Sequence, residues 1–283
     1  MGASGVRLSV ATNPGPASDA PSLLLHHGLA SSRHIWDLMV PRLTRRFRVV
    51  TYDARGHGRS AKPSSGYGFD RTVADLLAVA RAERLGRPIV VGHSWGAMVA
   101  LEAAARHPSR LAGAVLVDGG LVGPGLGWDW PTTARELAPP MLSGMPLETF
   151  RSSIAQWSPI PVTPEIEAIF LSLMRVDRDA RIHPRLSRAN HLRILRKIWE
   201  QRPIERYAEL RVPTLVILAR PADRDETEAP FLEAKRAGLA AARRAATGLP
   251  VTFTWMRGAH DLPLDRPAAL CARIERFAET AVG

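Results

Sequence analysis

Residues 89–98 read Ile-Val-Val-Gly-His-Ser-Trp-Gly-Ala-Met, and this stretch decides the fold. An apolar, β-branched run stops at Gly92, one serine follows, and an alanine-rich helical pattern begins at once. A G-x-S-x-G pentapeptide between a strand and a helix demands a turn so tight that the serine backbone is strained. Small residues at Gly92 and Gly96 let the strand and the helix approach each other there. We therefore expect Ser94 Oγ to stand clear of the sheet edge, where a substrate and a base can both reach it.

Short apolar runs around this stretch predict further strands of the same sheet. They lie at 22–25, 49–52, 89–91 and 114–117. Runs that are almost wholly apolar and are flanked by turn residues are typical of parallel strands covered on both faces. Helical patterns separate them, at 35–46, 71–85 and 97–107. This alternation predicts an α/β fold with a doubly wound, mostly parallel sheet, right-handed crossovers and helices on both faces.

The alternation stops after Gly120, and from 121 to 211 we expect helices and no strand. Segments rich in glycine and proline separate amphipathic patterns there, at 146–157, 164–174 and 183–201. Strand patterns resume at 213–218 and 251–255, with a helix at 225–246 between them and a last helix from 266. We predict an α/β core built from 1–120 and 212–283, interrupted by a helical cap at 121–211.

The composition favours an ordinary globular protein. The 283 residues suit one large α/β domain with an insert. Cys271 is the only cysteine, so an intrachain disulfide is excluded and a reducing compartment is indicated. Residues 1–10 lack the apolar core of an export signal, and no apolar run approaches the ~20 residues of a membrane helix. We expect a cytoplasmic protein that does not bind membranes, with the oligomeric state left open, a homodimer included.

The net charge of +11 raises the question of nucleic-acid binding. Lysine occurs only at positions 62, 197 and 235, and the arginines are spread through helical segments beside Ala, Leu and Glu. The sequence has no basic stripe interleaved with aromatic residues, so we interpret the charge as a solvated, arginine-rich surface and expect no nucleic-acid partner. It also has no metal-ligand spacing and no dinucleotide fingerprint, so we expect no metal and no cofactor.

Polar residues follow the ends of the predicted strands, where open α/β sheets bind their ligands. His27-Gly28-Leu29-Ala30 follows the strand at 22–25, and Gly258-Ala259-His260 follows the strand at 251–255. A serine hydroxyl is a poor nucleophile at neutral pH and needs a base, itself held in orientation by a third group. His260 is our candidate base. We expect His27 to stabilise a turn and His93 to pack, without proton transfer by either.

In this order the motifs resemble the α/β-hydrolase superfamily, over almost the whole chain. The stretch Tyr52–Ser60 resembles the structural loop of that family, and 92–96 its nucleophile elbow. The resemblance implies an eight-stranded type of sheet with an inserted cap. It also implies that Asp223 orients His260, and that the backbone N–H groups of Leu29 and Trp95 form an oxyanion hole.

The sequence offers more than one candidate for the orienting acid. Arg220-Pro221-Ala222 stands where the family usually has a tight turn that begins with glycine. Asp225 and Glu226 also lie within reach. Asp118 ends another predicted strand, and some relatives take their acid from that strand. We place Asp223 first and Asp118 second.

The predicted function is that of a cofactor-free serine hydrolase that cleaves a small carboxylic ester or lactone. Serine at the elbow argues against the dehalogenases and epoxide hydrolases of the family, which use aspartate there. Trp128 and Trp130, near the start of the predicted cap, are candidate walls for an apolar portion of the substrate. Three alternatives use the same triad: C–C bond hydrolysis, acyl transfer, and a lyase or cyclase step in biosynthesis. A fourth is a hydrolase-fold protein that only binds a ligand.

Overall fold

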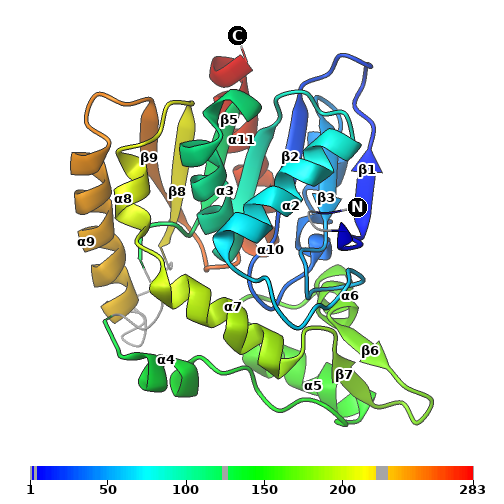
Figure 1. The fold of residues 1–283 in the computed structure, drawn as a ribbon. Helices are drawn as coiled ribbons and strands as arrows, with labels where there is room; N and C mark the ends of the chain where they lie inside the picture. The colour runs from blue at the N-terminus through cyan, green and yellow to red at the C-terminus, as the bar shows by residue number, and fades with distance from the viewer. Residues whose placement is uncertain (1, 3–4, 123–126, 221–228, 283) are drawn as a thin grey trace.

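The computed structural model describes residues 2, 5–122, 127–220 and 229–282 (Figure 1). Within them, seven strands form one sheet in the order β1-β3-β2-β4-β5-β8-β9, and β6 and β7 form a separate pair. The strands of the large sheet are β1 (Val10–Asn13), β2 (Ser22–His26), β3 (Arg48–Tyr52), β4 (Ile89–His93), β5 (Gly113–Val117), β8 (Thr214–Arg220) and β9 (Val251–Arg257). Within this large sheet β1 pairs antiparallel with β3, and all other neighbouring strands pair parallel. The predicted mostly parallel sheet is confirmed, with seven strands where the resemblance implied eight.

Helices cover both faces of the sheet, as predicted (Figure 1). One face carries α2 (Phe69–Ala82), α3 (Trp95–Arg106), α8 (Pro203–Tyr207) and α9 (Ala229–Ala245), and the other carries α1 (Val40–Leu43), α10 (Leu262–Asp265) and α11 (Pro267–Val282). Successive strand residues point to opposite faces. In β2, Leu24 therefore joins the first apolar cluster, while Leu23 and Leu25 join the second.

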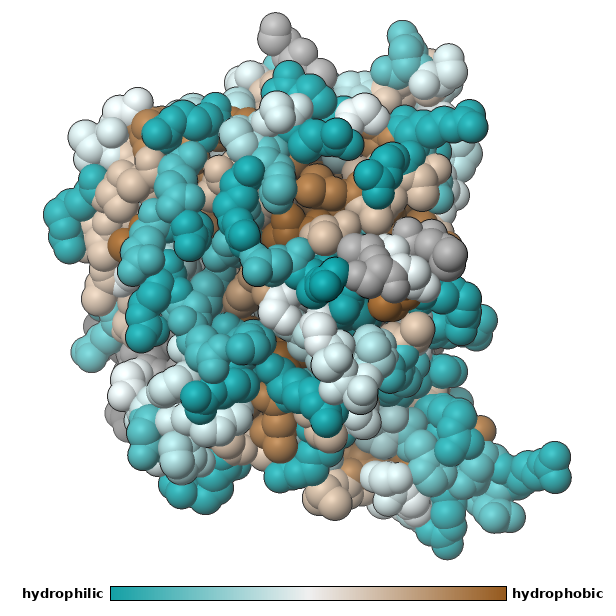
Figure 2. Space-filling model, in the orientation of Figure 1, coloured by the Kyte–Doolittle hydropathy of each residue, from teal (hydrophilic) through white to brown (hydrophobic). Residues whose placement is uncertain are grey.

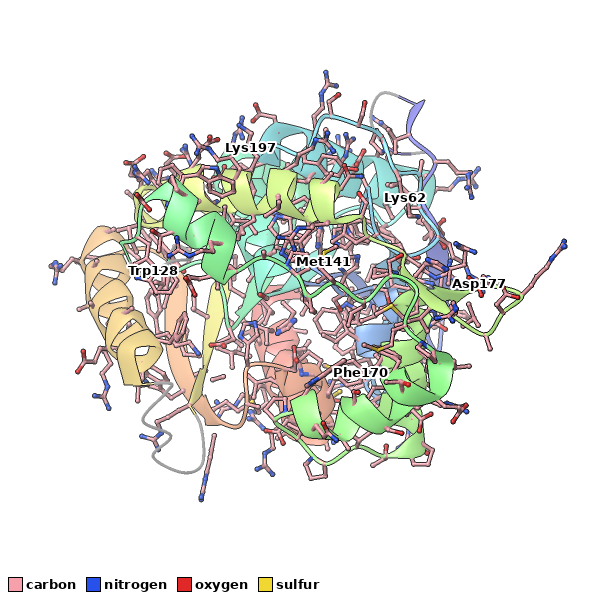
Figure 3. All side chains as sticks on the ribbon, turned by 90° about the horizontal axis from the view of Figure 1, so that it is seen from below. Lys62, Trp128, Met141, Phe170, Asp177 and Lys197 are labelled. Carbon is pink, nitrogen blue, oxygen red and sulfur yellow. The ribbon has the colours of Figure 1, made fainter. Side chains whose placement is uncertain are left out.

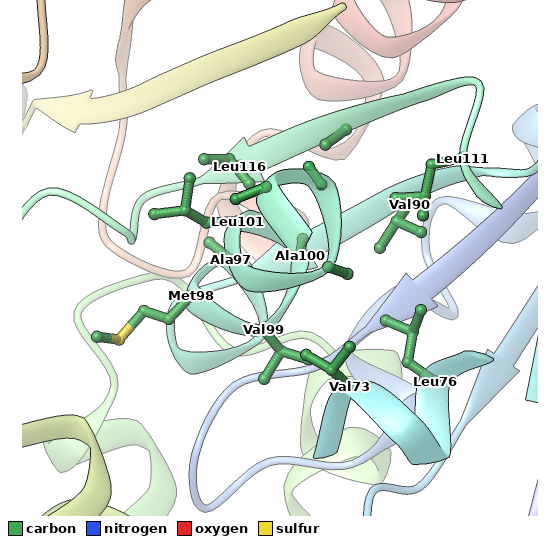
Figure 4. Close-up of a cluster of buried hydrophobic side chains, with 14 of the residues drawn as sticks. Val73, Leu76, Val90, Ala97, Met98, Val99, Ala100, Leu101, Leu111 and Leu116 are labelled. Atoms are coloured by element: carbon green, nitrogen blue, oxygen red, sulfur yellow. The ribbon is translucent and has the colours of Figure 1, made fainter. Parts of the chain in front are cut away.

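The helix that follows the predicted elbow, α3, lies at the centre of the first layer. Every residue from Trp95 to Ala105 is buried, because α3 packs on β4 and β5 below and on α2 beside it. In Figure 4, Val99 lies next to Val73 of α2, and Leu101 lies next to Leu116 of β5. The many alanines in α3 permit this close packing, since larger side chains would push the helix off the sheet.

The polypeptide between β5 and β8 forms an insert over one end of the sheet (Figure 1). It contains α4 (Trp130–Glu136), α5 (Leu147–Trp157), α6 (Pro164–Ser172), β6 (Met174–Val176), β7 (Ile182–Pro184) and α7 (Arg188–Glu200). Phe150, Ile154, Met174 and Ile182 form a small apolar core within it. The helical pattern predicted at 183–201 begins only at Arg188, because the side chain of Ser187 caps that helix by accepting from the Asn190 N–H.

Two expectations for the local structure were wrong. The insert contains a β-hairpin, β6–β7, although no strand was expected between 121 and 211. Each strand has only three residues, with Arg175 and His183 at their centres, so no alternating apolar pattern marks them. The single helix expected at 35–46 is a 3₁₀ turn (Arg33–Trp36) followed by α1, with Pro41 in the first turn of α1. Proline tolerates that position because the first N–H groups of a helix have no intrahelical partner.

The surface is strongly polar. The face in Figure 2 is mostly hydrophilic, including the corner where the β6–β7 hairpin projects. Several basic side chains form exposed ion pairs, such as Arg46–Glu279 at 2.8 Å and Lys197–Glu200 at 2.7 Å. Among the described helices, none has the length and hydropathy of a membrane span.

Buried histidines are an unusual feature of this core. His26, His57 and His93 are almost fully buried, and burial is the main reason why the pKa of each lies below its ordinary value. The pKa falls to about 3 for His26 and to about 4 for His93. The folded protein therefore holds these rings neutral well below pH 6.5, where the unfolded chain binds protons on them.

We expect stability to fall as the solution is acidified from pH 7 to pH 5. A histidine with a lowered folded pKa contributes fully above its unfolded pKa of about 6.5. That contribution is lost as the pH drops toward the folded value, because only the unfolded state gains the proton. Between pH 7 and pH 5 each such ring lowers the free energy of unfolding by roughly 2 kcal/mol. Urea unfolding at several pH values measures the free energy of unfolding. His26→Gln should weaken its dependence on pH, because about one proton fewer is taken up on unfolding. A free energy of unfolding that is flat over this range would contradict the expectation.

Candidate active site

The turn at Ser94 has the strained geometry that its sequence predicts. Ser94 has φ 55° and ψ −116°, between the end of β4 and the start of α3. A Cβ on Gly92 would collide with the carbonyl oxygen of Gly96, and a Cβ on Gly96 would collide with the carbonyl oxygen of His26. The Ser94 N–H donates to Val117 O at 2.9 Å, which ties the turn to β5. These contacts hold the Ser94 side chain in one direction, towards the cavity described below.

His260 reaches Ser94 from the turn after β9. Its Nε2 lies 3.0 Å from Ser94 Oγ, so the hydroxyl can donate to the ring. The turn is fixed from two sides. The Ala259 N–H donates to Asp265 Oδ2 at 2.8 Å, and His93 Nε2 donates to the carbonyl oxygen of His260 at 3.0 Å. His93 therefore packs, as expected, and in addition anchors the backbone that carries the candidate base.

The carboxylate bonded to His260 belongs to Asp118. Its Oδ2 lies 2.6 Å from His260 Nδ1. Asp118 directly follows β5, has φ 45°, and its side chain has no exposed surface. Our first choice of acid, Asp223, lies outside the described residues, as do Asp225 and Glu226. The position beside Nδ1 is filled by our second choice, Asp118. Asp118 reaches it because the following residue, Gly119, lets the chain pass directly against the Ser94 backbone.

His260 and Asp118 each shift the pKa of the other towards its charged form. Burial lowers the pKa of His260, but the hydrogen bond to Asp118 and the negative charge of that carboxylate outweigh burial and raise it overall. Burial raises the pKa of Asp118, but the bond from His260 and the charges of His260 and Lys235 lower it below its ordinary value. Asp118 is therefore a carboxylate that accepts from Nδ1–H, which leaves the lone pair of Nε2 facing Ser94.

The loop after β2 passes beside Ser94 and is held in place by His27. His27 Nε2 accepts from the Ala54 N–H at 2.9 Å, so its proton is on Nδ1, which donates to the carbonyl oxygen of Gly28 at 2.7 Å. In a trans peptide the C=O and N–H groups point in opposite directions. Holding Gly28 O thus also orients the N–H of Leu29. A Cβ on Gly28 would lie 3.1 Å from Ser94 Cβ, so this peptide passes beside the nucleophile.

A cavity of about 490 Å³ opens at Ser94. Its polar lining consists of Ser94, His260, Asp118, Lys235 and His191. The apolar lining consists of Leu29, Trp95, Met98, Leu121, Val122, Leu137, Leu195, Ile198, Leu218 and Phe231. The α7 helix of the insert supplies one wall through residues spaced three and four apart, which lie on one helix face. The insert thus encloses the space into which the reactive hydroxyl points.

Trp128 and Trp130 do not line this cavity, contrary to the expectation. Trp128 is 38% exposed and lines a separate hollow with Trp199 and Gly238, and in Figure 3 it lies beside α4. The Trp130 ring packs with Trp199, and Arg196 lies over both rings. The residues of α7 that line the cavity are His191, Leu195 and Ile198, and the hollow beside Trp128 shares Leu121 and Val122 with the cavity.

One group of described residues has the spacing of a metal site, namely His93, His260 and Asp261. Three of the four ring nitrogens in this group are already hydrogen-bonded, and the fourth, His93 Nδ1, is buried without a partner. His260 contacts Asp118 and Ser94 through its two ring nitrogens, and His93 Nε2 donates to a carbonyl oxygen. The grouping follows from the packing around the base and gives no reason to place an ion there.

Lys235 is the site residue that the sequence analysis missed. It comes from α9, and its Nζ lies 2.9 Å from Asp118 Oδ2. The two residues are 117 positions apart, and a lone lysine in a helical pattern carries no signal for such a contact.

Comparison with known proteins agrees with this fold. The family model described as alpha/beta hydrolase fold matches residues 21–156. The chain is 36% identical over 98 residues to 2-(acetamidomethylene)succinate hydrolase of Mesorhizobium japonicum, which is 35% of each chain. It is 41% identical over 105 residues to a non-heme chloroperoxidase of Streptomyces lividans, covering 36% of this chain and 38% of that protein. These matches thus span just over a third of the curated relatives.

Solved structures resemble the fold over almost its full length. The crystal structure of E-2-(acetamidomethylene)succinate hydrolase superposes with a TM-score of 0.77 at 24% identity, covering 97% of this chain and 96% of that one. A thioesterase domain from the curacin biosynthetic pathway gives a TM-score of 0.76 at 20% identity, covering 97% of each chain. Together with the strained serine elbow and the parallel sheet, the family-model match and these likenesses show the α/β-hydrolase fold and support a place for the chain in the α/β-hydrolase superfamily.

Proposed function

We propose that this protein is a serine hydrolase that cleaves a small carboxylic ester or lactone through an acyl-enzyme intermediate. The observation that carries the proposal is the continuous chain of hydrogen bonds from Ser94 Oγ through His260 to Asp118, at 3.0 and 2.6 Å. This geometry allows a hydroxyl to lose its proton as it attacks. The serine at the elbow and the apolar cavity around it support the same reaction.

The reaction proceeds in two halves. Ser94 Oγ attacks the acyl carbon while His260 Nε2 takes the hydroxyl proton, and Asp118 stabilises the resulting imidazolium. The N–H groups of Leu29 and Trp95 bind the oxyanion, and Trp95 is well placed because it opens α3 at the positive end of the helix dipole. His260 then protonates the leaving oxygen. In the second half it removes a proton from water as the water attacks the acyl carbon, and it returns that proton to Ser94 Oγ as the acid leaves.

The cavity favours an uncharged, apolar acyl group. Among the described lining residues, the only lysine or arginine is Lys235, and its charge is paired with Asp118. An anionic group bound there would compete with that pair and would lose its hydration among leucine, isoleucine and phenylalanine side chains. This lining differs from what a dicarboxylate such as a succinate derivative would need, so we do not transfer the substrate of that similar protein to this chain.

Ser94→Ala should abolish covalent labelling by a fluorophosphonate probe. The probe reports an activated serine, and only Ser94 has a base within hydrogen-bonding distance in the described active site. Ser153→Ala is the matched control, because Ser153 lies on α5 and its hydroxyl donates to Thr149 O. Labelling is read by intact-protein mass spectrometry. A folded wild-type protein that resists the probe would instead support the ligand-binding alternative.

Asp118→Asn should lower kcat by about 10³- to 10⁴-fold with a smaller change in KM. The amide can turn its NH₂ group towards His260 Nδ1, which then accepts and leaves a proton on Nε2, so the ring no longer takes the serine proton. Asp223→Asn should retain activity close to that of the wild type. Steady-state kinetics of both variants, with melting temperatures to confirm folding, decide between the two acids. The reverse pattern would restore Asp223 to the role.

Substrate preference should follow the lining of the cavity. In a series of p-nitrophenyl esters, kcat/KM should rise from acetate to medium-length acyl chains. The ester of a succinyl half-acid should react at least 10-fold more slowly than the butyryl ester of similar length, since its carboxylate must be desolvated. Faster turnover of the charged ester would disprove the apolar assignment. If no ester reacts while the probe labels Ser94, the result would support the C–C hydrolysis and acyl-transfer alternatives.

A further inference from the structure

A lysine side chain donates a hydrogen bond to Asp118, the proposed catalytic acid. Lys235 projects from α9, and its Nζ donates to Asp118 Oδ2 at 2.9 Å and to the carbonyl oxygen of Ala219 at 3.3 Å. Its side chain is 20% exposed and lines the cavity. The chain has only three lysines, and the other two, Lys62 and Lys197, which Figure 3 labels, are not among the residues that line the cavity.

One carboxylate oxygen of Asp118 accepts from both side chains. Asp118 Oδ2 accepts from Lys235 Nζ and from His260 Nδ1, which lies 2.6 Å away. The other oxygen, Oδ1, accepts from the Ala219 N–H at 2.8 Å. The carboxylate therefore cannot rotate without breaking a bond, and Lys235 and the end of β8 together determine the direction from which it meets the imidazole.

We propose that Lys235 is a positioning residue, which fixes the carboxylate of Asp118 and keeps His260 neutral between turnovers so that it can accept the serine proton. The proposal rests on the proposed function only for its catalytic consequence. The carboxylate alone would favour the imidazolium, and a fixed positive charge on the same oxygen opposes that protonation. Lys235 thus limits the rise that Asp118 imposes on the pKa of His260.

Other titratable groups surround His260 and stay in place when Lys235 is changed. His93 faces it from β4 with the ring centroids 5.0 Å apart, and Asp261 follows it in its own turn. His191 lies on the wall that α7 contributes to the cavity. Asp261 raises the pKa of His260, whereas Lys235 is the one group among the named causes besides burial that lowers it. Removing the charge of Lys235 should therefore raise the pKa of His260.

The test is the titration of the His260 ring by NMR in the wild type and in two neutral variants, Lys235→Met and Lys235→Gln. The resonance is assigned by its loss in His260→Asn. The pKa of His260 should rise by roughly one unit in both variants, and Lys235→Arg should return it towards the wild-type value. Lys197→Met, which removes a lysine paired with Glu200 on the surface, should leave it unchanged.

Kinetics supply the second readout. The acid limb of the pH profile of kcat/KM should move upward by the same amount in Lys235→Gln, so that activity at pH 6 falls several-fold more than activity at pH 8. An equal loss of activity at all pH values, with an unshifted ring titration, would mean that Lys235 only supports the fold, and would overturn the proposal. The Gln variant retains a donor for Asp118, which protects the measurement if the Met variant does not fold.

The two proposals can fail separately. The ring titration requires no turnover, so a shifted pKa in a protein that no fluorophosphonate labels would refute the hydrolase function and leave the Lys235–Asp118–His260 coupling standing. Labelling of Ser94 together with an unshifted ring would refute the role of Lys235 and leave the hydrolase function intact.

Discussion

The close approach of β4 and α3 is the constraint on which the rest of this structure depends. Gly92 and Gly96 leave no room for a Cβ, and the backbone turns between them in a single residue with a positive φ. Strain of this kind costs about 1–3 kcal/mol and persists only where the surroundings over-determine it. Here α3 is buried along almost its whole length, so its packing energy holds Ser94 in a conformation that the residue would not adopt alone.

The topology of the sheet places the strained turn at Ser94 beside the other loops that form the candidate site. The chain winds outward from β2 in both directions, to β3 on one side and to β4 on the other, so the loops after β2 and β4 diverge at this point. Ligands bind at such a switch point because it leaves a crevice beyond the carboxyl ends of the strands. The loop carrying Leu29 and the turn carrying Ser94 border the crevice, and the turns after β5 and β9 bring Asp118 and His260 to the same edge.

The polar network in this crevice combines burial with full pairing. Asp118 has no exposed side-chain surface, yet its two oxygens accept bonds from an imidazole, an ammonium group and a backbone N–H. A buried carboxylate with fewer partners would take up a proton and could no longer orient the ring. The apolar walls from α7 and α9 strengthen each of these interactions, since they exclude water and lower the local dielectric.

The sequence alone determined the features that arise from short-range sterics and periodicity. The elbow at Ser94, six strands of the sheet, the helices around it and the candidate base His260 all follow from patterns within about ten residues. Even the region of the insert was marked, by the loss of strand–helix alternation after Gly120. Its short hairpin was not, because three-residue strands with charged centres show no period.

Only the tertiary structure decided which groups meet. Asp118 and Asp223 both follow predicted strands, and the sequence alone left both open as the acid, whereas the structure places the carboxylate of Asp118 beside His260 Nδ1. The pairing of Lys235 with Asp118, and the choice of Leu195 and Ile198 over Trp128 and Trp130 as cavity walls, depend on how α9 and α7 are rotated about their axes. Such rotations are set by packing between segments far apart in the chain, which no local pattern encodes.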